Sequence, residues 1–146
     1  MPTLTQDRTE PAKAAQAVTG VVPHLTCADA PKAIAFYTKA FGAREIGRHM
    51  AEDGKRIMHA HIVINGGNVF LHDDFPEYRG GAAAPEPASI CLHLHVDNAD
   101  TWWQRALDAG ATVLMPLVNQ FWGDRYGQLK DPWGYVWSIG QTLDQP

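Results

Sequence analysis

Residues 23–43 have the sequence PHLTCADAPKAIAFYTKAFGA, and residues 92–111 have the related sequence LHLHVDNADTWWQRALDAGA. Each stretch begins with a short run of alternating polar and apolar residues, passes an Asp or Asn turn and continues with helical spacing. Each then ends at a glycine, Gly42 in the first and Gly110 in the second. One unit that starts with a strand and a helix is therefore predicted to occur twice.

The middle of each stretch predicts an amphipathic helix that packs on a sheet. Asp29 is the expected N-cap of the first helix, and Pro31 suits its first turn, whereas Asn98 is the expected N-cap of the second. The predicted apolar stripes are Ile34, Tyr37 and Phe41 in the first helix, and Trp103, Ala106, Leu107 and Gly110 in the second.

Three further strands are predicted after each helix, separated by turn signals. After the first helix they span residues 44–52, 55–64 and 68–73. The second unit opens with a strand at residues 89–96, and its later strands span residues 112–115, 126–129 and 135–139, with an aromatic loop at residues 116–125. The pattern indicates an α+β protein of two βαβββ modules.

The segments outside the two modules show neither helical nor strand periodicity. Residues 1–19 are polar and rich in alanine, which predicts a flexible N-terminal arm. Residues 75–87 are rich in Gly, Pro and Ala, which predicts a linker. We therefore expect the first module at residues 20–74 and the second at residues 88–146.

Composition argues against nucleic-acid and membrane partners. The formal net charge is −4, and charged residues of both signs make up 19% of the chain, so no basic stripe is present. No apolar run approaches the length of a signal-peptide core or a membrane span, so we expect a cytoplasmic protein. Cys27 and Cys91 are too few for a disulfide framework, and we expect both to be buried, reduced thiols.

Alternation along the strands separates apolar faces from histidine-bearing faces. The faces expected under the helices are Val21, Pro23, Leu25 and Cys27, then Met58, Ala60, Ile62 and Ile64, then Ile90, Leu92, Leu94 and Val96. The opposite faces carry five of the seven histidines, namely His24, His59, His61, His93 and His95. A single strand histidine is more often exposed or bonded to a neighbouring strand, but the set of five favours one lined hollow that receives a small molecule.

These modules resemble the glyoxalase, bleomycin-resistance and extradiol-dioxygenase superfamily, also called the vicinal oxygen chelate superfamily. The resemblance covers about residues 21–141. The likeness to its PhnB-like branch rests on residues 23–43, on FWGDRYG at residues 121–127 and on DPWGYVWSI at residues 131–139. It implies an eight-stranded, cupped arrangement with helices on the outer face, commonly a homodimer, with a small-molecule ligand in the cup.

The resemblance also implies where a metal ion would bind. Metal-dependent members use a histidine or similar group early in each module's first strand and a glutamate late in each last strand. The corresponding first-strand residues here are Val22 and Cys91, and Ser138 stands at the second glutamate position. The matching stretch of the first module, residues 69–72, has no carboxylate. We therefore expect no standard metal site and no cofactor.

Two weaker alternatives retain a divalent metal ion. The inward histidines His59, His61 and His93 could form an unconventional site, because two histidines at alternate positions of one strand can bind the same ion. Alternatively, His72 and Asp73 would enter the site if the strand register were shifted by one residue. Both alternatives rank below the absence of a metal ion.

Two interpretations of the FWGDRYG segment stay open. In the structural one, Gly123 and Asp124 make a turn while Phe121 and Trp122 cover the end of a core. In the functional one, Trp122, Arg125 and Tyr126 stand at the cavity mouth, where rings stack on a flat ligand and the guanidinium pairs with an anion. The other tryptophans are expected in the core: Trp102, Trp103, Trp133 and Trp137.

The leading hypothesis is a metal-free protein that binds a flat or amphipathic small molecule. Its predicted ligand-binding residues are His24, His59, His61, Cys91, His93, His95, Trp122, Arg125, Tyr126 and Ser138. The alternative is an enzyme acting on vicinal oxygens, a lyase, isomerase or dioxygenase, with a histidine as general base or as an unconventional metal ligand. A purely regulatory or assembly role is the least favoured, because only the lack of a complete site supports it.

Overall fold

The computed structural model describes residues 17–144, so most of the predicted N-terminal arm, residues 1–16, lies outside the described residues. The first module consists of β1 (His24–Thr26), α3 (Ala30–Phe41), β2 (Arg44–Met50), β3 (Ile57–Ile64) and β4 (Gly67–His72). A 3₁₀ helix, η1 (Pro76–Arg79), lies in the connection. The second module consists of β5 (Cys91–His95), α4 (Ala99–Ala109), β6 (Thr112–Asn119), β7 (Asp124–Lys130) and β8 (Val136–Thr142). The predicted α+β fold of two βαβββ modules is confirmed.

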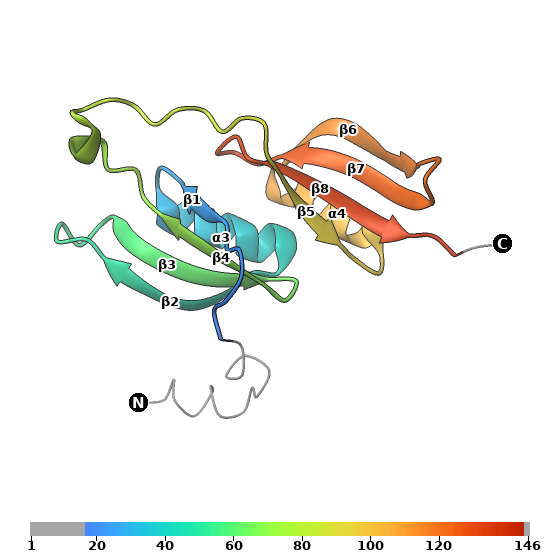
Figure 1. The fold of residues 1–146 in the computed structure, drawn as a ribbon, viewed down its shortest axis with the longest axis horizontal. Coiled ribbons are helices and arrows are strands. Elements are labelled where there is room, and N and C mark those ends of the chain that lie inside the picture. Colours follow the sequence, from blue (N-terminus) through green and yellow to red (C-terminus); the bar gives the residue numbers. More distant parts are fainter. Residues whose placement is uncertain (1–16, 145–146) are drawn as a thin grey trace.

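The two modules have the same strand order, and the registers of β1–β4 and β3–β4 match those of β5–β8 and β7–β8. Their sheets run β1-β4-β3-β2 and β5-β8-β7-β6, and the first strand of each is parallel to its neighbour. His24 lies opposite Phe70 in the first sheet, and His93 lies opposite Ser138 in the second. His24 is therefore structurally equivalent to His93, and Phe70 to Ser138. Figure 1 shows the two sheets side by side, with both helices behind them.

The helix ends form as the sequence predicts. Asp29 Oδ1 accepts a hydrogen bond from Lys32 N at 3.3 Å, and Asn98 Oδ1 accepts one from Thr101 N at 3.2 Å. Both helices end at a glycine with positive φ, 67° at Gly42 and 119° at Gly110. These caps satisfy terminal backbone groups that otherwise lack partners.

One continuous core joins the modules beneath both sheets. The Phe41 ring lies 4.7 Å from the Trp137 ring, and the hydroxyl of Tyr37 donates to Asp131 Oδ2 at 2.6 Å. Burial, followed by the nearby Asp131 carboxylate, raises the pKa of Tyr37 well above its usual value. Of the four tryptophans predicted in the core, Trp137 is buried, whereas Trp102, Trp103 and Trp133 are partly buried against it. Helix α3 thus buries its predicted apolar stripe, whereas in α4 only Ala106 is buried, Trp103 and Leu107 are partly buried, and Gly110 is exposed.

Four residues that were expected to be buried are exposed. Val21 is 98% exposed and Ile90 is 60% exposed, because β1 and β5 begin only after them. Cys91 is also exposed, so the expectation of two buried thiols holds only for Cys27. Met58 is 41% exposed, because a register irregularity in the β2–β3 pair places Ile57 in the core instead.

The predicted aromatic loop at residues 116–125 is shorter than expected. Strand β6 continues to Asn119, and the connection to β7 spans only residues 120–123. Pro116 lies where the β6–β7 register shifts, and β6 is an edge strand, so the missing proline N–H disrupts no ladder. In residues 17–144, no helix is long and apolar enough to cross a bilayer.

Candidate ligand-binding site

The first sheet carries five histidines on the face away from its helix. The Phe70 ring lies at the centre, 5.8 Å from His24, 4.8 Å from His59 and 5.2 Å from His61, measured between ring centroids. His72 lies 4.9 Å from His24. His49 on β2 lies opposite His59 and completes the group. We call His24, His49, His59, His61, His72 and Phe70 the first histidine face.

The sequence prediction missed His49, Phe70 and His72 on this face. Extending the alternation into β4 would have found Phe70 and His72, because the even-numbered residues of that strand point away from the buried Val69 and Leu71. His49 had no comparable signal, since every residue of β2 is exposed. A cross-strand pairing had to be known before His49 could be placed.

The second sheet carries a chain of four hydrogen-bonded side chains. Ser138 Oγ lies 2.7 Å from His93 Nδ1, and His93 Nε2 lies 3.1 Å from His95 Nδ1. The chain ends where His95 Nε2 lies 2.7 Å from Thr142 Oγ1. Ser138 is buried and Thr142 is exposed, so the chain leads from the interior of the sheet to solvent.

Gly140 makes room for this chain. A Cβ at this position would lie 2.8 Å from His93 Cε1 and 3.1 Å from His93 Nε2. The first distance is too short for unbonded atoms and the second is tight, so any larger residue at Gly140 would require the imidazole of His93 to move. The backbone at this site therefore needs glycine for close approach rather than for an unusual conformation.

The contact between His93 Nε2 and His95 Nδ1 needs one nitrogen to donate and the other to accept. One of the two facing nitrogens must accept, so the pair holds its contact with two or three ring protons, whereas a fourth would set two N–H groups against each other. Burial, followed by the like charge of His95, lowers the pKa of His93. On the first face, burial followed by His72 and His59 lowers the pKa of His24. Both faces therefore favour neutral imidazoles at these positions.

Aromatic rings extend the second face toward the β6–β7 loop. The Tyr126 ring stacks on His93 with 5.9 Å between centroids and 20° between planes. The Trp122 ring meets Tyr126 edge-on at 5.6 Å and is 50% exposed. We call His93, His95, Trp122, Tyr126, Ser138 and Thr142 the second histidine face. A flat molecule would find one ring wall and two imidazoles here.

Arg125 does not join this face, contrary to the prediction. Its Nη2 and Nε atoms donate to Asp100 Oδ1 at 3.0 and 3.2 Å, and Nη1 donates to Asn119 Oδ1 at 3.0 Å. Alternate residues of a strand point to opposite sides, so Arg125 points away from the side that Tyr126 occupies. Only Trp122 and Tyr126 of the predicted loop residues lie beside the histidines.

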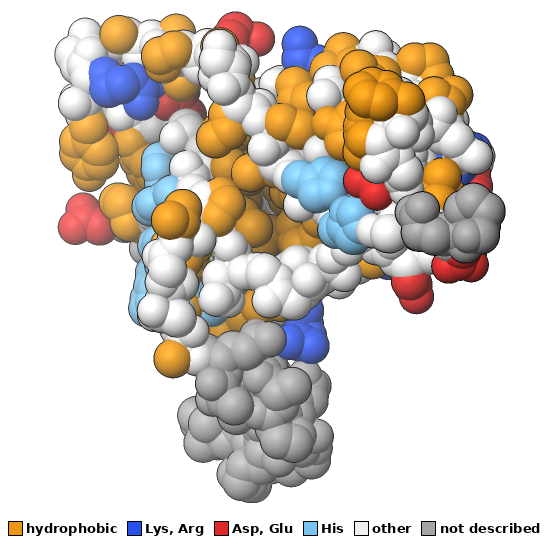
Figure 2. All heavy atoms as spheres, turned by 45° about the vertical axis from the view of Figure 1, so that its right-hand side comes forward, with side chains coloured by type: hydrophobic (Ala, Val, Ile, Leu, Met, Phe, Trp, Pro, Cys, Tyr) orange, Lys and Arg blue, Asp and Glu red, His pale blue; other side chains and the backbone are white. Residues whose placement is uncertain are grey.

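The two histidine faces open on the same side of the molecule but form separate groups. Figure 2 shows the histidines in two patches, with hydrophobic surface between them. None of the ring contacts within residues 17–144 joins the two groups. A groove of about 300 Å³ runs between the modules, and its lining includes Asn68, Cys91 and His93. Cys91, two residues before His93 on β5, therefore lines this groove together with His93.

The residues present do not fit the divalent metal site that the fold family implies. Val22 and Phe70 offer no donor atom, Cys91 offers a thiol, and Ser138 offers a hydroxyl already bonded to His93. Across residues 17–144, no three His, Cys, Asp or Glu side chains are arranged to hold an ion, which includes the alternative set of His59, His61 and His93.

The other alternative, His72 with Asp73, fails for a structural reason. The Asp73 carboxylate is buried on the helix side, where it accepts hydrogen bonds from Ala30 N at 3.0 Å and Ile57 N at 2.7 Å. His72 points to the opposite side and hydrogen-bonds the Asp73 carbonyl oxygen. No shift of register brings the two side chains to one point.

Comparison with known proteins agrees with this fold. A model of the Glyoxalase/Bleomycin resistance protein/Dioxygenase superfamily matches residues 16–139. The chain belongs to this superfamily. An uncharacterised protein of Mycobacterium bovis is 49% identical over 126 residues, which cover 83% of this chain and 82% of that protein. The family resemblance inferred from the sequence is thereby confirmed.

Several solved structures share the fold. A Pseudomonas aeruginosa protein has a TM-score of 0.70 at 22% identity and covers 87% of this chain and 100% of its own. A PhnB protein from Bacillus cereus has a TM-score of 0.67 at 21% identity, with 85% and 100% covered. TioX from Micromonospora sp. ML1 has a TM-score of 0.64 at 23% identity, with 88% and 99% covered. At these identities the likeness concerns the fold alone.

Proposed function

We propose that this superfamily member binds a flat or amphipathic small molecule on its second histidine face without a metal ion. The observation that carries the proposal is the stacking of Tyr126 on His93, with the half-exposed Trp122 edge-on beside them. Aromatic rings arranged in this way add stacking to the burial of a flat ligand. The imidazole of His95 supplies a polar contact within the same wall, and the buried Ser138 orients His93 through its hydrogen bond.

The ligand would be held by neutral donors and acceptors rather than by a charge. Arg125 pairs with Asp100 and points away from this face. The lowered pKa of His93 favours an uncharged imidazole. A neutral or weakly cationic aromatic compound therefore suits this wall better than a strong anion. We place Cys91, on β5 of the same module, at the edge of this site, and the first histidine face, with His24, His59 and His61, outside it on the neighbouring module.

We also propose that the protein works as a homodimer in the cytoplasm. Strand β6 exposes apolar side chains on both of its sides, since Val113 is 47% exposed and its neighbour Leu114 is 50% exposed. Such an edge strand pairs readily with another chain unless it is covered. A second copy packed over β6 would remove this surface from water and would bring a further wall toward the second face.

The test measures binding to metal-stripped protein. Purified protein treated with EDTA is titrated calorimetrically with 1-naphthol, ethidium and quercetin as planar probes. We expect binding of at least one probe, weakened about fivefold by Tyr126→Ala, because one stacked ring contributes roughly 1 kcal/mol. The matched control is Tyr78→Ala, an exposed tyrosine on η1. Affinity that appears only after a divalent ion is added would refute the metal-free part.

A second candidate function is acid–base catalysis, and the four-membered chain of the second face supports it. His93 Nε2 and His95 Nδ1 share one ring proton across a 3.1 Å contact, so a proton taken up by His93 can pass to His95 while His95 Nε2, beside Thr142 Oγ1, releases its own proton to solvent. The test is turnover of the glutathione hemithioacetal of methylglyoxal or of catechol by wild type and His93→Gln. Turnover lost in the variant while probe binding persists would favour an enzyme, and no turnover in wild type would remove this candidate for those substrates.

A further inference from the structure

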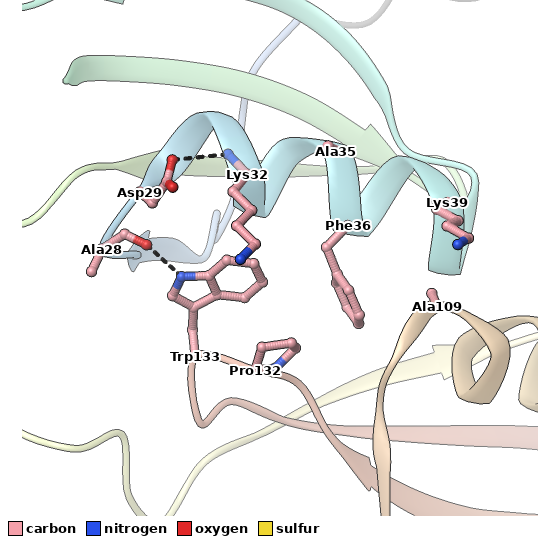
Figure 3. Close-up of a pocket in the computed structure, with 9 residues that line it drawn as sticks. All are labelled: Ala28, Asp29, Lys32, Ala35, Phe36, Lys39, Ala109, Pro132 and Trp133. Carbon is pink, nitrogen blue, oxygen red and sulfur yellow. Dashed lines mark hydrogen bonds between the residues drawn. The ribbon is translucent and has the colours of Figure 1, made fainter. Parts of the chain in front are cut away.

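A second cavity lies on the helix side, away from both histidine faces. Its volume is about 520 Å³, and it opens at the seam where the modules meet. Figure 3 shows Lys32, Phe36 and Lys39 on α3 along one side, with Trp133 and Ala109 of the second module on the other. No histidine is among its lining residues in the described chain.

Two aromatic rings form the apolar wall of this cavity. The centroid of the Trp133 ring lies 5.8 Å from that of Phe36, at an angle of 68° between planes. The indole N–H of Trp133 donates to the carbonyl oxygen of Ala28 in the other module, which fixes the ring across the seam. Ala35 and Ala109 keep the space open, because a methyl group fills little of it. Flat apolar surface is thus available on more than one side.

Two uncompensated cations stand at the edge of this wall. Lys32 and Lys39 are seven residues apart on α3, which places them two turns or about 10.5 Å apart along the axis. Within residues 17–144, every salt bridge uses an arginine, and neither lysine ammonium has an ion-pair partner. The only acidic lining residue, Asp29, accepts its hydrogen bond from the Lys32 backbone N–H. In a chain of net charge −4, this edge is locally positive.

We propose that this cavity is a second ligand site, for a flat aromatic anion such as an aryl carboxylate. The aryl group would lie against Trp133 and Phe36, and the carboxylate would lie between the ammonium groups of Lys32 and Lys39. The lysines attract the carboxylate and the two rings bury the aryl group, so both parts of the ligand are bound in one cavity. Because the walls come from both modules, a bound anion stabilises their contact at the seam.

The probe for this site is 1-naphthoate, added to ¹⁵N-labelled protein and followed by NMR. We expect the largest shifts at the Trp133 indole N–H and at the amides of residues 28–39. We also expect a rise in the melting temperature at saturation, because the ligand binds only the folded protein. Shifts confined to the second histidine face, or no binding at all, would overturn the proposal.

Charge reversal supplies the quantitative control. Lys32→Glu/Lys39→Glu should weaken 1-naphthoate binding about tenfold or more, whereas the matched double variant Lys55→Glu/Lys130→Glu changes the net charge equally and should leave it within about twofold. An equal effect of both double variants would refute the site, since only net charge would then matter. Tyr126→Ala should leave 1-naphthoate binding unchanged, so this test and the test of the second histidine face can fail independently.

Discussion

The two modules share a backbone but differ on the faces that point away from the helices. The strand registers make Phe70 equivalent to Ser138, and His72 equivalent to Gly140. At the first position a ring fills the centre of one face, whereas a hydroxyl starts the hydrogen-bonded chain of the other. At the second, an imidazole packs on His24, whereas a glycine leaves room for His93.

This difference shows which parts of the repeated unit are constrained by folding. The helix caps and the glycines after each helix are kept in both copies, because every copy must end its helix and cover its sheet. The sheet faces that point away from the helices are not needed to build the core, so each module can carry different side chains there without loss of the fold. The module with the open hydrogen-bonded chain is therefore the one to which we assign binding.

The largest expected effect concerns a buried contact that the modules make differently. Asp73 accepts from Ala30 N at the start of α3, and Gln141 accepts from Ala99 N at the start of α4. Asp73 is buried and also accepts from Ile57 N, so Asp73→Ala should cost about 3 kcal/mol of unfolding free energy. Gln141→Ala removes one cap-like bond and should cost about 1 kcal/mol. Urea denaturation compares them, and equal costs would contradict this difference.

A smaller loss of unfolding free energy is expected from substitutions at Gly140 and at the equivalent residue His72. Gly140→Ala should cost about 2 kcal/mol, because the new methyl group displaces His93 and breaks its contact with His95. His72→Ala removes a partly buried ring at the equivalent place and should cost about 1 kcal/mol. Urea denaturation of both variants measures the gap. A Gly140→Ala variant as stable as wild type would show that the chain of the second face is not tightly packed.

The smallest expected effect is a pH dependence of stability. The pKa values of His24 and His93 are lowered by burial, so the folded protein binds these protons less tightly than the unfolded chain. Stability should therefore fall as the pH decreases from about 8 to about 5, and be regained on return. His93→Gln should make this slope shallower, whereas Gln128→Ala, which removes no imidazole, should not. An unchanged slope in His93→Gln would refute the assignment.

The local parts of this structure were predictable from the sequence. Short stretches of sequence were enough to predict the N-caps Asp29 and Asn98 and the apolar stripe of α3, because capping and helical periodicity depend on near neighbours. The inward orientation of His93 and His95 followed from alternation in the same way. The PhnB-like resemblance needed only short stretches of residues as well.

The parts that depend on distant partners were not predictable. Ile57 is buried in place of Met58 because the β2–β3 pair contains a register irregularity, which no local sequence pattern predicts. Arg125 found Asp100, which lies 25 residues away at the start of α4. The cavity beside Trp133 depends on the packing of two modules and had no counterpart in the sequence pattern.

The most direct test of the central claim compares the two histidine faces in one experiment. Long-range ¹H–¹⁵N NMR spectra of the imidazoles are recorded while a planar probe that binds in calorimetry is added to metal-free protein. The account predicts that the His93 and His95 ring signals shift with the bound fraction, whereas those of His59 and His61 move less. Equal shifts on both faces, or shifts on the first face alone, would contradict the assignment of binding to the second module.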